Sequence, residues 1–143
     1  MSLLGQVQDD VKSALKAGDR ERVHALRLIA DALQKAEKDD GGDPVDVLQR
    51  ERKRRLEAAE AYDEGGRTAI AAAERREADL IASYLPEQLS DEELNAIVGD
   101  AVAQSGASSP QELGKVMGLV MPHVKGRADG KRVSTAVKEM LTP

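Results

Sequence analysis

The residues best suited to chemistry are cations near the carboxyl end of the chain. Residues 121–132 read MPHVKGRADGKR and lie between two segments with helical apolar spacing. Lys125, Arg127 and Lys131 could converge on the backbone N–H groups that open the last helix, where hydrogen bonding and the helix dipole both favour phosphate. Alternatively, Asp129 could cap that helix and leave the cations as solvated surface charges. The sequence supports either arrangement.

Charge is distributed unevenly along the chain, whose formal net charge is −5. Residues 115–138 carry six basic residues and one acid, a net charge of +5, so the rest of the chain carries −10. Such asymmetry is typical of a surface that faces a polyanion. The basic residues of this stretch are Lys115, Lys125, Arg127, Lys131, Arg132 and Lys138.

Several classes of function are disfavoured by what the composition lacks. With no cysteine, the chain has no thiolate nucleophile, disulfide or thiolate metal site. The two histidines, His24 and His123, are far apart, so we expect neither a metal site nor a catalytic residue, and no cofactor. Two tyrosines are the only aromatic residues, which argues against base stacking. With no apolar span or secretory signal, we expect a cytoplasmic protein without membrane contact.

The fold class we expect is all-α, because the apolar residues follow helical spacing and small helix formers dominate. Residues 1–86 predict a four-helix bundle-like domain. Gly18 closes the first helix, Asp19 caps a second that reaches about Lys38, and a turn follows at 39–42. Asp43 and Pro44 open a third helix that reaches Glu64, and a fourth reaches Tyr84.

Residues 90–143 predict a three-helix domain after a short hinge near Pro86. Ser90 and Glu93 form a capping box that opens its first helix, and Ser109 with Glu112 repeats this pattern. The second helix is expected to stop at Pro122. The last helix carries the apolar residues between Val133 and Leu141.

A second charge-rich run, at residues 50–55, predicts a solvated helix face rather than a binding patch. Glu51 and Arg55 have the i, i+4 spacing of an ion pair on a helix. Arg27 and Arg52 fall on the apolar stripes of their helices, so we expect both to be partly buried. For Arg52 we expect Glu74 or Glu77 as a partner.

Three stretches together resemble the GatB/YqeY family over essentially the whole chain. They are Leu26-Arg27-Leu28, residues 84–90 (YLPEQLS), and a carboxyl-terminal segment that reads LGKVM at 113–117 and MP at 121–122, followed by KGRADG at 125–130. The resemblance implies a bundle of about four helices joined to a three-helix unit. In that family the similar module forms the tail of the B subunit of glutamine-dependent aspartyl/glutamyl-tRNA amidotransferase and helps hold the tRNA. It is also appended to some glutaminyl-tRNA synthetases.

The resemblance implies a tRNA-binding helper in translation, with RNA contacts at Lys115, Lys125, Arg127 and Lys131. Arg132 is added to these contacts only because it is a neighbouring cation. The catalytic portion of the amidotransferase subunit has no counterpart in this chain, so we expect no catalysis by the chain alone. Two other functions remain open. One is an accessory role in glutamine-dependent amidation (carbon–nitrogen ligase chemistry) with an amidotransferase subunit or an aminoacyl-tRNA synthetase as partner. The other is a helical bundle that only binds proteins.

Overall fold

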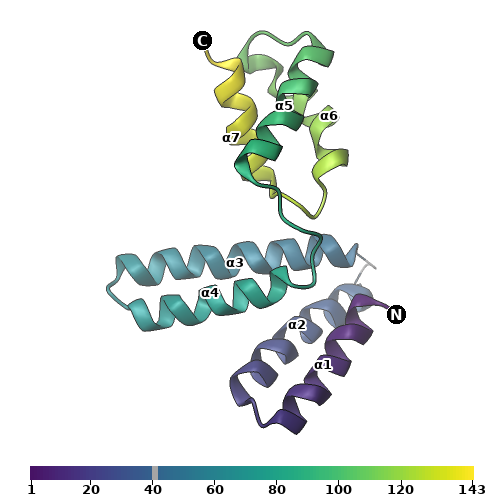
Figure 1. The fold of residues 1–143 in the computed structure, drawn as a ribbon, viewed down its shortest axis with the longest axis vertical. Helices are drawn as coiled ribbons and strands as arrows, with labels where there is room; N and C mark the ends of the chain where they lie inside the picture. The colour runs from purple at the N-terminus through teal and green to yellow at the C-terminus, as the bar shows by residue number, and fades with distance from the viewer. Residues whose placement is uncertain (40–41) are drawn as a thin grey trace. The chain divides into compact units, whose positions relative to one another are not determined.

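The computed structural model describes residues 1–39 and 42–143, and within these ranges the chain is helical with no strand, which confirms the all-α prediction (Figure 1). The chain divides into two compact units, residues 1–85 (unit 1) and residues 86–143 (unit 2). No described helix is long and apolar enough to cross a membrane. The helices are α1 (Leu3–Ala17), α2 (Arg20–Asp39), α3 (Pro44–Glu64), α4 (Thr68–Ala82), α5 (Asp91–Ser105), the short 3₁₀ helix η1 (Pro110–Glu112), α6 (Leu113–Val124) and α7 (Gly130–Leu141).

Unit 1 consists of two helical hairpins, α1 with α2 and α3 with α4, and the helices of each hairpin lie side by side (Figure 1). All four helices contribute to one core, in which Val7, Leu26, Leu48 and Ile81 have no exposed surface. Between α3 and α4 the buried side chains are small. Fully buried alanines on these helices allow close approach of their backbones, and they are Ala59, Ala71 and Ala78.

The helix ends of unit 1 follow the sequence signals. Gly18 adopts φ 73°, a left-handed conformation that favours glycine, and its N–H binds the carbonyl of Ala14. The carboxylate of Asp19 accepts the backbone N–H of Arg22 at 3.1 Å. Asp43 caps α3 through the N–H of Val45 at 2.9 Å, with Pro44 in the first turn. The predicted turn at 39–42 includes residues 40 and 41, which lie outside the described residues.

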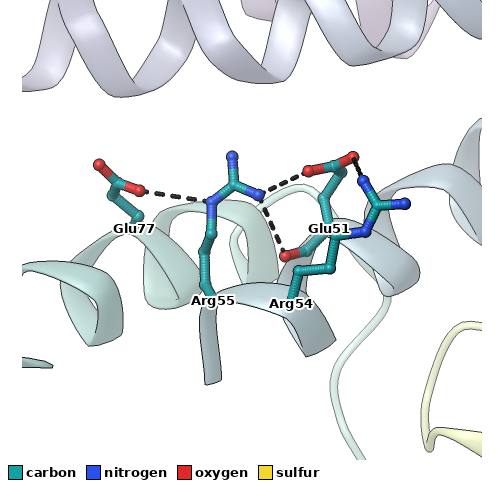
Figure 2. Close-up of polar contacts among 4 residues, drawn as sticks. All are labelled: Glu51, Arg54, Arg55 and Glu77. Carbon is teal, nitrogen blue, oxygen red and sulfur yellow. Dashed lines mark hydrogen bonds and ion pairs between the residues drawn. The ribbon is translucent and has the colours of Figure 1, made fainter. Parts of the chain in front are cut away.

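A cluster of charged side chains joins α3 to α4 (Figure 2). The predicted pair of Glu51 and Arg55 is confirmed, with Oε2 and Nη1 2.5 Å apart. The Nε of Arg55 also donates to Glu77 at 3.3 Å. The prediction that Arg52 takes Glu74 or Glu77 as its partner is wrong, because among the described residues Arg52 forms no ion pair with either, and its buried Nε has no hydrogen-bond partner. In this antiparallel hairpin, Glu77 lies level with Arg55 because both are equally far along the chain from the turn at Gly66.

The prediction that Arg27 is partly buried is also wrong, because its side chain is exposed. The side of α2 that faces the core is formed by Leu26, Ile29 and Leu33, which are almost fully buried. Arg27 follows Leu26 by one residue, a rotation of about 100° around the helix. This rotation carries the guanidinium out of the core.

Unit 2 packs α5, α6 and α7 around a core of valines with no exposed surface. Both predicted capping boxes are present, at Ser90 with Glu93 and at Ser109 with Glu112. The prediction that Pro122 ends its helix is wrong, because α6 continues to Val124. Proline costs the helix the hydrogen bond to the carbonyl four residues earlier and crowds that carbonyl, but the complete burial of Val124 favours the two helical residues that follow Pro122.

Candidate nucleic-acid interface

The first residues of unit 2 are hydrogen-bonded to the connection between α6 and α7. The side-chain amide of Gln88 donates to the carbonyl of Gly126 at 2.7 Å, and the N–H of Leu89 donates to the carbonyl of Arg127 at 2.9 Å. The Nε of Arg127 donates in return to the carbonyl of Glu87 at 3.2 Å. These bonds satisfy backbone groups outside the helices and fix the position of the α6–α7 connection, which carries Lys125 and Arg127 of the predicted site.

Two of the predicted RNA contacts are arginines that bind groups of unit 2. The Nη2 of Arg132 donates to the carbonyl of Leu89 at 2.6 Å and to the carboxylate of Asp91 at 2.9 Å. Arg127 lies 3.9 Å from the carboxylate of Glu93. About a third of each arginine side chain is still exposed, 33% for Arg132 and 38% for Arg127. Both arginines therefore hold the fold, and part of each remains accessible to a ligand.

The amino terminus of α7 is capped by a carboxylate. Asp129 accepts the backbone N–H of Arg132 at 2.8 Å. Of the two arrangements that the sequence allowed, the structure shows the cap. An anion bound to this surface would therefore be held by side-chain cations rather than by the free N–H groups of α7.

Four of the five predicted site residues lie in the eight-residue stretch from Lys125 to Arg132, and the fifth lies apart. Lys125 follows the last residue of α6, Arg127 lies in the connection, and Lys131 and Arg132 lie in the first turn of α7. Lys115 lies near the opposite end of α6, ten residues from Lys125, which corresponds to about 15 Å along a helix. All three lysines are exposed. The predicted site is therefore one cluster of cations at 125–132 and a separate lysine.

A groove of about 440 Å³ lies beside this cluster, between α5 and the first turns of α7. Its charged lining comprises the cations Lys131 and Arg132 and three carboxylates, those of Asp91, Asp129 and Glu139. A mixed lining of this kind suits a polyanion poorly. We therefore do not expect this groove to be the place where phosphate binds.

The sequence interpretation missed the acidic first turn of α5, formed by residues 91–93. The sequence predicts Glu93 only as part of a capping box, and the contacts of Glu93 with Arg127 and of Asp91 with Arg132 depend on the tertiary fold. Hydrogen bonds from the side chain and backbone of Ser90, with a smaller effect from the charge of Arg127, lower the pKa of Glu93. Glu93 therefore stays ionised beside the cationic cluster at neutral pH, which reduces the local positive charge.

The other capping glutamate of unit 2 lies near the separate lysine. The backbone N–H groups of Ser108 and Ser109 lower the pKa of Glu112, and the charge of Lys115 adds a smaller effect in the same direction. His123 is exposed. In residues 1–39 and 42–143, no group of three or more His, Asp or Glu side chains is placed to hold a metal ion.

Residues 4–141 match the sequence model of a family described as Yqey-like protein. The chain belongs to this family. The match covers nearly the whole chain and confirms the resemblance seen in the three sequence stretches. A comparison with curated proteins found no match for this chain. This Yqey-like protein is a helical module whose residues 125–132 carry four cations, in the α6–α7 connection and the first turn of α7.

Proposed function

We propose that this Yqey-like protein binds tRNA through the cations of unit 2, in contact with the sugar–phosphate backbone. The observation that carries the proposal is the concentration of Lys125, Arg127, Lys131 and Arg132 in the connection between α6 and α7 and the first turn of α7. The rest of the chain is strongly acidic. Backbone contacts of this kind fix position and recognise the shape of folded RNA, and they carry little sequence information.

The lysines and the arginines have different parts in this proposal. Arg127 and Arg132 keep residues 87–91 against the connection and so fix where the cationic cluster lies. Lys125 and Lys131 are exposed and bind phosphate as point charges on long, flexible side chains. Lys115 contributes a further contact at the other end of α6.

The experiment replaces the three lysines and leaves the arginines intact, because the arginines support the fold. The variant Lys115→Glu/Lys125→Glu/Lys131→Glu is compared with wild-type protein for binding of labelled unfractionated tRNA by fluorescence anisotropy. The matched control is Lys12→Glu/Lys35→Glu/Lys38→Glu, three exposed lysines of unit 1 that change the net charge equally. We expect the first variant to lose most of the affinity and the control to lose little.

Equal losses in both triple variants would show that only net charge matters and would overturn the proposal. Unchanged binding in the first variant would overturn it as well. Circular dichroism of both variants checks that the helical content is intact, so that a loss of binding reports the surface and not the fold.

A further inference from the structure

A second groove, of about 450 Å³, lies in unit 1 where α1 ends and α2 begins. It is distinct from the cations of unit 2, and the proposed binding of tRNA makes no use of it. Side chains from both helices of the first hairpin line it, together with the left-handed glycine that joins them. The lining residues are Ala14, Leu15, Gly18, Arg20, Val23, His24 and Arg27.

The ionisable side chains that line this groove are all basic. Arg20, His24 and Arg27 lie on one side of α2 at the spacing i, i+4, i+7, and all three are exposed. Within the described part of the chain, no ion pair or side-chain hydrogen bond involves any of the three. In contrast, every ion pair shown in Figure 2 ties an arginine of α3 to a carboxylate.

The acids at the start of α2 are engaged away from the groove. The carboxylate of Asp19 caps α2 at the N–H of Arg22, and the carboxylate of Glu21 accepts from Arg76 of α4 at 3.0 Å. Asp31, one turn beyond Arg27, reduces the positive charge at the far end of this side of α2. The groove itself therefore presents cations with no carboxylate in its lining.

The groove also presents apolar surface. Leu15 is 53% exposed at its edge, whereas Ala14 and Val23 are buried beneath it. Leu28, one turn beyond His24 on α2, is a further large apolar side chain with substantial exposure. An exposed leucine in the same groove as two arginines is of no use to a phosphate chain, but it offers contact area to an aliphatic side chain.

From this combination we infer that the α1–α2 groove binds an acidic segment of a partner protein that also carries an aliphatic side chain. Carboxylates of the segment pair with Arg20 and Arg27, whose planar guanidinium groups can each bind a carboxylate through two parallel hydrogen bonds. The aliphatic side chain packs on Leu15 and Val23. Charge complementarity selects the acidic partner, and Leu15 favours a peptide over a nucleic acid.

The test uses a short fluorescent peptide in which leucines recur at i, i+4 spacing among glutamates, added to the full chain. We expect it to bind the wild type, and to bind Arg20→Glu/Arg27→Glu at least about tenfold more weakly. Leu15→Asn should raise the Kd about fivefold, because the peptide would no longer bury about half of a leucine side chain. The matched control is Arg50→Glu/Arg67→Glu, exposed arginines elsewhere in unit 1, which should bind as the wild type does.

Two further probes separate the acidic peptide from other ligands. The same peptide with serine in place of leucine should bind markedly more weakly, and oligouridylate should not displace the leucine peptide. Absence of peptide binding, equal binding of the serine peptide, an equal loss in the control variant, or displacement by oligouridylate would each overturn the inference. None of these outcomes affects the proposed tRNA contacts, which the lysine variants of unit 2 test separately.

Discussion

Arg132 donates a hydrogen bond of 2.6 Å to the backbone carbonyl of Leu89, a residue 43 positions earlier in the chain. The same Nη2 atom reaches the carboxylate of Asp91 at 2.9 Å. A residue that the sequence marks as a surface cation thus fastens the start of unit 2 to the first turn of α7. This relationship separates the cations that support the fold from those available to a ligand.

Replacing Arg132 by alanine should destabilise unit 2 by about 1–2 kcal/mol, because the largely buried carbonyl of Leu89 loses a charged donor. Lys131→Ala, at an exposed neighbouring position, should change the stability by less than about 0.5 kcal/mol. Amide hydrogen exchange of α5 and α7 measured against urea concentration reports unit 2 separately from unit 1. Equal exchange in the two variants would contradict the structural role of Arg132.

The stability of unit 2 should fall in acid because Ser90 lowers the pKa of Glu93, and the N–H groups of Ser108 and Ser109 lower that of Glu112. For a carboxyl group whose pKa is lower in the folded state, the stabilisation is present above the unfolded value. It is lost as the pH falls below about 4.5 and through the folded pKa.

The variant Glu93→Gln/Glu112→Gln should therefore show a smaller loss of stability between neutral and acidic pH than the wild type. Glutamine keeps an oxygen that can accept the same N–H groups, so the capping geometry survives without the titrating proton. Urea denaturation of unit 2 at a series of pH values measures the effect. Glu92→Gln, in the same turn of α5 but outside the capping box, is the control.

Arg55→Met should destabilise unit 1 by about 1–3 kcal/mol, because the change leaves partly buried carboxylates with fewer donors. The side chains of Arg55 and Glu51 are each only 16% exposed, and Glu51 would keep its contact with Arg54 at 3.3 Å (Figure 2). The comparison is Arg75→Met, which removes the more exposed pair with Asp63 and should cost at most about 1 kcal/mol. Thermal unfolding, monitored by circular dichroism, would show whether Arg55→Met loses more stability than Arg75→Met.

The affinity for tRNA should fall with salt less steeply than the number of cations suggests. Five phosphate contacts would give a slope of log K against log salt of about −4.5 for a duplex. Because Arg127 and Arg132 are partly buried and hold groups of residues 87–93, whereas the side chains of Lys115, Lys125 and Lys131 are exposed, we expect the lysines to dominate and the slope to be roughly −2 to −3. A salt titration of tRNA binding measures it, and a slope steeper than about −4 would show that the arginines release their carboxylates to bind RNA.

The sequence by itself determined the helical class and most helix ends, because these depend on residues within a few positions of one another. Gly18 with Asp19, Asp43 with Pro44, and Ser90 with Glu93 each lie close enough in sequence to specify a boundary. The predicted helix end at Pro122 is wrong because the burial of Val124, which comes from tertiary packing, outweighs the local effect of the proline. The cationic stretch at 115–138 was also visible in the sequence as an excess of charge.

Only the tertiary structure decided which charges face which partners. Glu77 pairs with Arg55 and not with Arg52, because the antiparallel hairpin determines which residues of α3 lie opposite which residues of α4. Arg127 and Arg132 meet residues 87–93 because the core of unit 2 folds the α6–α7 connection back onto the start of α5. An ion pair requires its atoms within a few ångströms, and for residues forty positions apart the packing of the helices, not their spacing in sequence, sets that distance.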